Sequence, residues 1–158
     1  MEKDFLDVFP NLEVDEELRE LLPVVKVERV AINRRKDLLR VYIVSRQWIH
    51  KKHIYKLEQA IRTQFFSNVR IRVKIIEKFN LSAQYTPENL MEVYSPSIRM
   101  ELKEYSIFLY NMFSTAKMEF EDEDTLHITF ADTAIAREKS WELLRILEKI
   151  FCERCGVS

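Results

Sequence analysis

The pattern of apolar and polar positions predicts β-strands in the first half of the chain. Two runs rich in β-branched residues, 24–33 and 38–45, flank a charged turn at 34–37, and we expect them to pair as a hairpin. A third run, 69–76, alternates strictly between apolar and basic residues. Its expected core face comprises Val69, Ile71, Val73 and Ile75, and its opposite face comprises Arg70, Arg72 and Lys74.

Helical spacing separates the second strand from the third. In 51–66 the apolar residues recur three or four positions apart, which predicts an amphipathic helix packed on the sheet. These residues are Ile54, Leu57, Ile61 and Phe65. Upstream, Asp15 is the expected N-cap of a short helix that Pro23 ends. Its apolar face carries Leu18, Leu21 and Leu22. We therefore expect an acidic N-terminal docking arm at 1–23, followed by a ββαβ module at 24–79.

The pattern changes after Phe79, and we place a second module at 80–158. Its first helix is predicted from an N-cap threonine, a proline at the first helical position and an early acid, at residues 86–88. We expect this helix to end near Tyr94, because Pro96 follows. A second helix then presents a buried stripe of Ile98, Leu102, Tyr105, Leu109 and Met112.

A hairpin and a long helix complete the second module. Residues 118–120 and 126–130 are the expected strands, with an inner face of Leu126, Ile128 and Phe130. Either Asp132 or Thr133 caps the final helix, which Gly156 can close in a left-handed conformation. The apolar residues of this helix are Trp141, Leu143, Leu144, Leu147, Ile150 and Phe151. The predicted fold class is α+β, with a ββαβ module followed by an ααββα module.

Charge divides the chain more sharply than its net value of −1 indicates. Residues 24–79 hold 15 Lys and Arg against four acids, a net +11, whereas the segments on either side each carry −6. The candidate basic interaction face consists of Arg34, Arg35, Lys36, Arg70, Arg72 and Lys74. Two other interpretations stay open: basic residues simply solvate the outer side of a small sheet, or the acidic segments cover this face within the fold.

Composition excludes several classes of protein. Gly156 is the one glycine of the chain, so no glycine-rich loop can approach a phosphate, and Walker and dinucleotide-binding motifs are absent. Two cysteines near the C-terminus cannot form a disulfide framework, which favours a reducing compartment. The sequence contains neither a signal peptide nor about 18 consecutive apolar residues, so we expect a cytoplasmic protein that does not enter a membrane.

No residue pattern predicts a catalytic or metal site. The Cys152–Cys155 pair ends a helix and lacks the second ligand pair of a structural zinc site, so we interpret it as incidental. Two lysines separate His50 from His53 and would repel a dication, which favours a solvated basic helix start. The acidic turn at 121–124 lacks the ligand spacing and the glycine of a calcium loop. We expect no catalytic residue, cofactor, metal or small-molecule substrate in this chain.

The segment from Val27 to Lys78 resembles the N-terminal region of PolC-type DNA polymerase III, the large replicative polymerase of low-GC Gram-positive bacteria. The matching features are an acidic helix, a hairpin with a basic turn, a tyrosine-containing helix that ends in phenylalanine, and an alternating basic strand. The stretch from Thr86 to Gly156 is similar to the second N-terminal module of the same polymerases.

This resemblance implies a non-catalytic interaction region of a DNA polymerase, whose polymerase and 3′–5′ exonuclease domains would follow Ser158. The first module of the family is similar to a terminal domain of the clamp-loader tau subunit, so the expected partners are replisome proteins, tau first. The second is similar to a type II KH fold, but it has no GXXG loop with which to clamp nucleotides. The alternatives are auxiliary nonspecific nucleic-acid binding through the basic face and, from another class, a stand-alone enzyme.

Overall fold

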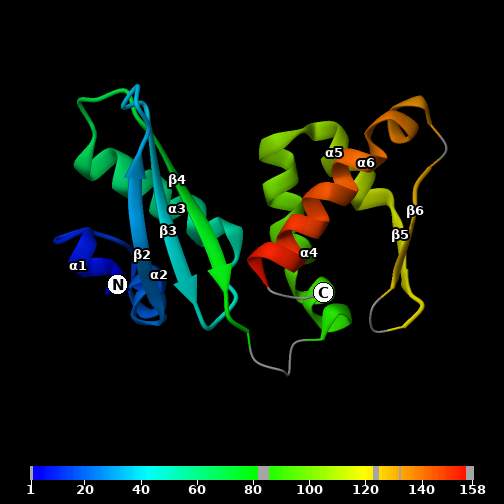
Figure 1. Ribbon diagram of the computed structural model, residues 1–158, viewed down its shortest axis with the longest axis horizontal. Helices are drawn as coiled ribbons and strands as arrows, with labels where there is room; N and C mark the ends of the chain where they lie inside the picture. The colour runs from blue at the N-terminus through cyan, green and yellow to red at the C-terminus, as the bar shows by residue number, and fades with distance from the viewer. Residues whose placement is uncertain (1, 82–85, 123–124, 132, 156–158) are drawn as a thin grey trace. The chain divides into compact units, whose positions relative to one another are not determined.

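The computed structural model describes residues 2–81, 86–122, 125–131 and 133–155. The chain divides into two compact units, Met1–Leu81 (unit 1) and Ser82–Ser158 (unit 2). Unit 1 combines a sheet with helices, whereas unit 2 is built mainly of helices with one two-stranded hairpin (Figure 1). The predicted α+β class is confirmed.

Unit 1 contains a four-stranded sheet in the order β1-β2-β3-β4. Its elements are β1 (Lys3–Asp4), α1 (Phe5–Val8), α2 (Glu16–Leu21), the short 3₁₀ helix η1 (Leu22–Val24), β2 (Val25–Ile32), β3 (Leu38–Ser45), α3 (Lys51–Phe65) and β4 (Arg72–Phe79). Strands β2 and β3 pair antiparallel, whereas β3 and β4 pair parallel. Because a parallel pair needs a crossover connection, α3 joins β3 to β4. The predicted ββαβ order is confirmed.

Helix α3 covers one face of this sheet, behind the strands as drawn in Figure 1. Three of its four predicted apolar residues, Ile54, Leu57 and Ile61, are fully buried. Four strand residues on the same side of the sheet are buried as well: Val41, Ile43, Val73 and Ile75. The fourth residue, Phe65, is 42% exposed at the end of the helix, where its ring lies 5.8 Å from that of Phe9. Among the described residues of unit 1, no helix lies on the other face of the sheet, here called the open face.

Residues 2–23 are part of unit 1 and differ in this respect from the separate arm that their acidic composition predicts. Strand β1 extends the sheet, with Lys3 opposite Val27. The apolar residues of this segment are buried: Phe5, Phe9, Leu12, Leu18 and Leu22. Asp15 caps α2 as predicted, accepting a hydrogen bond from the Leu18 N–H at 2.9 Å. Apolar burial decides where this segment lies, and its acids stay on the surface of the unit.

Unit 2 follows the predicted ααββα order. Its elements are α4 (Pro87–Tyr105), α5 (Ile107–Thr115), β5 (Lys117–Phe120), β6 (Leu126–Thr129), α6 (Ala134–Glu148) and the π-helical turn η2 (Lys149–Arg154). Strands β5 and β6 form an antiparallel hairpin, with Met118 opposite Ile128. The helices supply the buried core, which includes Leu90, Tyr94, Ile98, Leu102, Leu109, Leu143 and Ile150. The expected likeness to a KH fold stays a prediction.

The break between the first two helices lies ten residues later than predicted. Pro96 lies inside α4, which continues to Tyr105, so the prediction that proline ends this helix is wrong. Proline removes one backbone N–H donor but does not remove the apolar stripe of Tyr94, Ile98 and Leu102, which is fully buried. The break occurs at Ser106, whose extended backbone (φ −160°, ψ 123°) and side-chain oxygen cap α5.

The hairpin and the last helix bury less apolar surface than predicted. Leu126, Ile128 and Phe130, the predicted inner face, are each half-buried. On α6, Leu143 and Leu147 are buried, whereas Trp141 is 74% exposed. Thr133 caps α6 by accepting from the Ala136 N–H at 3.0 Å, and this alternative of the cap prediction is confirmed. The predicted cap at Asp132, the closing Gly156, and Glu123 and Asp124 of the acidic turn lie outside the described residues.

Candidate interaction surface

Strand alternation places two of the predicted basic residues on the open face of the sheet. Arg72 and Lys74 are exposed on β4, while Val73 and Ile75 between and beyond them are buried against α3. In the parallel register Lys74 lies opposite Arg40 of β3, and both side chains are exposed on the same face. Arg40 therefore extends the basic surface from the edge strand to the neighbouring strand.

The turn between β2 and β3 presents three more of the predicted residues, Arg34, Arg35 and Lys36, all exposed. Asn33 holds this turn: its side-chain oxygen accepts from the backbone N–H groups of Asp37 and Leu38, at 3.0 and 3.1 Å. Lys36 has a φ of 58°, in the left-handed region. Such a residue lets the chain reverse between twisted strands, so the basic triplet is carried at the tip of an ordered turn.

The start of β4 lies beside this turn. The Arg72 N–H donates to the Asp37 carbonyl at 2.8 Å. Arg70, which is exposed, precedes the strand in the connecting loop, as does Val69. Val69 is 52% exposed, so its predicted place on the core face is wrong: the regular alternation begins only at Ile71. The structure thus brings the turn and the beginning of β4 to one end of the sheet.

Three further cations of the strands belong to the same face and were missed in the sequence pattern: Arg29, Arg40 and Lys78. Arg29 and Tyr42 are register partners on β2 and β3, and the guanidinium carbon lies 4.0 Å from the centroid of the tyrosine ring. This is a cation–π contact. The signal that could have found Arg40 is the alternation in 38–45, where it stands between two apolar residues.

The predicted cations are not neutralised locally. Among the described residues, none of the six forms an ion pair with a carboxylate, whereas Lys26 at the other end of β2 pairs with Asp4. Unpaired cations gathered on one face produce a positive potential that attracts anionic groups and acts beyond contact distance. The six residues are Arg34, Arg35, Lys36, Arg70, Arg72 and Lys74.

Behind the sheet, α3 and β4 share a buried ion pair that the sequence did not reveal. Lys51 Nζ lies 2.9 and 3.2 Å from the two carboxylate oxygens of Glu77. The two side chains are 8% and 1% exposed. The sequence predicted that the start of this helix is solvated, and this prediction is wrong for Lys51, whose side chain is buried. Nearby, Glu58 of α3 accepts a hydrogen bond from the Ile75 N–H at 2.8 Å, and burial raises the pKa of this carboxyl above its ordinary value.

The histidines at the start of α3 have structural contacts. His50 is the N-cap, and its Nδ1 accepts from the Lys52 N–H at 3.0 Å. His53 reaches α2, where its Nε2 lies 3.5 Å from a carboxylate oxygen of Glu17. Burial is the main cause that lowers the pKa of both histidines. Across the described parts of the chain, no group of three or more His, Cys, Asp or Glu side chains is arranged to hold a metal ion.

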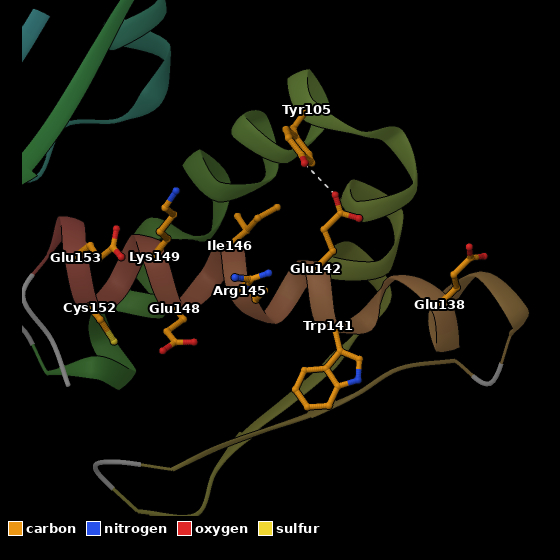
Figure 2. A pocket seen from close by; sticks show the side chains of 10 residues that line it. All are labelled: Tyr105, Glu138, Trp141, Glu142, Arg145, Ile146, Glu148, Lys149, Cys152 and Glu153. Carbon is orange, nitrogen blue, oxygen red and sulfur yellow. Dashed lines mark hydrogen bonds between the residues drawn. The ribbon is translucent and has the colours of Figure 1, made fainter. Parts of the chain in front are cut away.

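Unit 2 has an open hollow of about 700 Å³ along α6 and η2 (Figure 2). Its lining is mixed in charge, and the side chains do not converge: Trp141 and Glu148 project to one side of the helix, Glu142 and Lys149 to the other. Tyr105 donates a hydrogen bond to Glu142 at 2.9 Å, which raises the pKa of the tyrosine. This hydrogen bond links the end of α4 to α6.

The two cysteines occupy different surroundings at the end of unit 2. Cys152 is exposed at the hollow, whereas Cys155 is buried. Of the helices in the described ranges, none combines the length and the apolar character that a membrane crossing requires.

Unit 1 is thus a small α+β module with one helix-covered face and one basic face. Residues 4–75, which lie within unit 1, match the family described as DNA polymerase III polC-type N-terminus I. The match confirms the PolC resemblance for these residues and connects the chain with DNA replication. It ends within β4, so the expected likeness of unit 2 to the second N-terminal module stays a prediction. No curated protein and no solved structure matches the chain.

Proposed function

We propose that the chain is a non-catalytic N-terminal docking region of a replicative DNA polymerase, and that the open face of unit 1 binds another protein of the replication machinery. The observation that carries the proposal is the set of exposed cations at the turn end of the sheet, none of which has an acidic partner among the described residues. The family match supplies the context of DNA replication.

The clamp-loader tau subunit is the first partner to test, because the resemblance relates the first module to a terminal domain of tau. Electrostatic complementarity contributes mainly to the association rate and to the choice of partner. A docking face of this kind should therefore recognise an acidic surface.

The test measures binding of the purified chain to tau, to the sliding clamp and to other fork proteins by surface plasmon resonance. Arg72→Glu/Lys74→Glu should weaken the complex by about tenfold or more, mostly through slower association. The matched control is Lys52→Glu/Arg62→Glu, which makes the same charge change on exposed positions of α3. A dissociation constant of tens of micromolar corresponds to a binding free energy of about 6–7 kcal/mol. If no complex forms at protein concentrations of tens of micromolar, the proposal is refuted.

A second candidate function, nonspecific DNA binding, is favoured by the same cations. Phosphate contacts release counterions, so affinity for single- and double-stranded DNA should then fall steeply with salt. Fluorescence anisotropy at increasing salt, with the two double variants, measures this dependence. A shallow salt dependence, or equal loss of affinity in the α3 control, would count against a DNA site on the open face.

A further inference from the structure

The open face is not uniformly basic, because its central row is apolar. Tyr42 of β3 lies opposite Ile76 of β4, and both side chains are half-buried on the open face. The next row toward the turn pairs Arg40 with Lys74, and the row on the other side pairs the buried Val44 with the exposed Lys78. The apolar row is therefore flanked by Lys74 and Lys78 along β4, and along β3 by Arg40 on the side toward the turn.

The Tyr42 ring is already covered on one side by a cation. Arg29 lies 4.0 Å above the ring centroid, in the position that a stacked base would need. The remaining apolar surface comes from Ile76, whose aliphatic side chain suits an apolar partner residue better than a nucleobase. These two residues favour a protein over a nucleic acid as the ligand of the central row.

Each edge of the sheet carries a local feature that disfavours addition of a further strand. On β4, Glu58 occupies the outward N–H of Ile75 at 2.8 Å. On β2, the two residues of β1 cover one end of the edge, and the pairing with β3 shifts register between Val27 and Arg29. An occupied or bulged edge disfavours strand pairing at that place, which favours the open face over the edges as the surface for a protein ligand.

We propose that the open face binds an amphipathic acidic helix of a partner protein, with apolar side chains on Tyr42 and Ile76 and carboxylates on Arg40 and Lys74. This inference rests on the proposed docking function and names the chemistry of the partner. Successive rows on one face of a strand are about 7 Å apart. One helical turn advances about 5.4 Å, so apolar and acidic residues one turn apart reach neighbouring rows. Like charges on the face disfavour pairing with the same face of a second copy.

The probe is a labelled peptide of about 18 residues with Leu at helical i, i+3, i+4 and i+7 spacing, Glu on the flanks and Ala elsewhere. The comparison peptide has the same composition with its Leu residues distributed around the helix. A single-stranded oligothymidine of similar charge serves as the nucleic-acid comparison. Binding to the full chain is followed by fluorescence anisotropy, and sedimentation velocity monitors self-association.

Two pairs of variants separate the apolar and the charged parts of the site. Ile76→Ser tests the central row, and its matched control is Val30→Ser, because Val30 is 43% exposed on the opposite face of the sheet. Arg40→Glu/Lys74→Glu tests the basic row against the α3 control Lys52→Glu/Arg62→Glu. Arg40→Gln/Lys74→Gln replaces the reversal if circular dichroism shows that the Glu variant is unfolded.

The amphipathic peptide should bind, with about tenfold weaker affinity after the charge reversal and about threefold weaker affinity in Ile76→Ser. Both controls should stay within about twofold of the parent chain. Three results would overturn the inference. The distributed-Leu peptide binds equally well, the chain binds oligothymidine in preference to the peptide, or the peptide binds only to a self-associated form of the chain.

The outcomes also separate this inference from the proposed function. If fork proteins bind and respond to Arg72→Glu/Lys74→Glu but not to Ile76→Ser, and the peptide does not bind, docking stands and the helical ligand is refuted. If the peptide binds and loses affinity in the Ile76→Ser and Arg40→Glu/Lys74→Glu variants, while no fork protein binds, the helical ligand is supported and the replisome partner is refuted.

Discussion

The two units distribute their charges in opposite ways. Unit 1 holds 17 Lys and Arg against 12 acids, a net +5, and unit 2 holds eight against 14, a net −6. In unit 1 the two-residue period of the strands sends apolar residues to α3 and cations to the open face. In unit 2 the long helices intersperse both signs along their exposed sides, as around the hollow on α6. Strand alternation, more than the amount of charge, therefore produces a surface of one sign.

The units also differ in how charge is used inside the fold. Unit 1 buries the Lys51–Glu77 pair almost completely between α3 and β4. Unit 2 keeps its principal ion pair at the surface of the core: Arg154 and Glu101 are each 19% exposed, with N–O distances of 2.8 and 3.1 Å. A fully buried charge that loses its partner costs more than a partly exposed one, so the two units should respond unequally to equivalent substitutions.

The largest effect is expected for Lys51→Met. Removing the ammonium leaves the Glu77 carboxylate buried without the lysine that faces it, and the free energy of unfolding should fall by about 3–5 kcal/mol. Urea denaturation measures the loss. Hydrogen exchange resolved by segment should show it in α3 and β4, with little change in α4 and α6.

The control for this substitution is the double variant Lys51→Met/Glu77→Leu, which removes both charges. Because well-packed apolar residues often replace a buried ion pair without loss, this variant should recover most of the stability. If the double variant is no more stable than Lys51→Met, the buried charge is not the cause of the effect.

A smaller loss is expected for Arg154→Ala in unit 2. The guanidinium donates to both carboxylate oxygens of Glu101 and to the Tyr94 hydroxyl at 3.2 Å, and these contacts hold η2 against α4. Hydrogen bonds of charged groups contribute about 1.5–3 kcal/mol, so the loss should fall in this range. The measurement is the protection of backbone amides in η2 and α4 from hydrogen exchange. The matched control is Lys149→Ala, because Lys149 is an exposed residue of the same η2 segment. Equal effects of the two substitutions would contradict the assignment.

The pattern of the sequence predicted those features of the fold that depend on neighbouring residues. Alternation placed Ile71, Val73 and Ile75 in the core, and helical spacing did the same for Ile54 and Leu57. The order of the elements follows from such patterns together with the caps at Asp15 and Thr133. The exposed basic turn is likewise a local property, since an Asn33 side chain and one left-handed residue suffice to build it.

Features that depend on distant partners could not be predicted. Lys51 and Glu77 are 26 positions apart, and each alone is typical of a solvated surface residue. Pro96 indicates a helix end in isolation, yet the apolar stripe on both sides of it keeps α4 intact. The row of Tyr42 and Ile76 likewise exists only because the parallel register brings β3 and β4 together.

Capping of the helices in unit 2 should contribute a further, smaller amount. Ser106 accepts from the Leu109 N–H at 3.5 Å and ends α4, whereas Thr133 accepts from the Ala136 N–H at 3.0 Å. Ser106→Ala and Thr133→Ala should each lower the free energy of unfolding by about 0.5–2 kcal/mol, with the larger loss at the shorter bond. Urea denaturation orders the two variants, and a larger loss in Ser106→Ala would show that hydrogen-bond length does not rank these caps.

The smallest effect is a pH dependence that belongs to unit 1. Burial, the largest cause, lowers the pKa of His53 below its ordinary value of 6.5, while Glu17 raises it and Lys52, Lys56 and Asp15 contribute less. The unfolded chain therefore binds more protons than the folded chain as the pH falls below 6.5. The neutral His53 is compatible with the fold, so the stability of unit 1 is fully present above that pH and decreases in acid. Glu58, whose pKa is raised from 4.5, acts in the opposite direction at lower pH.

His53→Gln removes this titration and should make stability less sensitive to pH between about 7.5 and 5.5. Glu17→Gln removes the carboxylate that lies 3.5 Å from the ring, so the pKa of His53 falls further and the sensitivity increases. The free energy of unfolding from urea titrations at both pH values measures the two slopes. Parallel slopes in the parent chain and in both variants would show that His53 does not cause the acid sensitivity, and that burial between α2 and α3 leaves this histidine free to take up a proton.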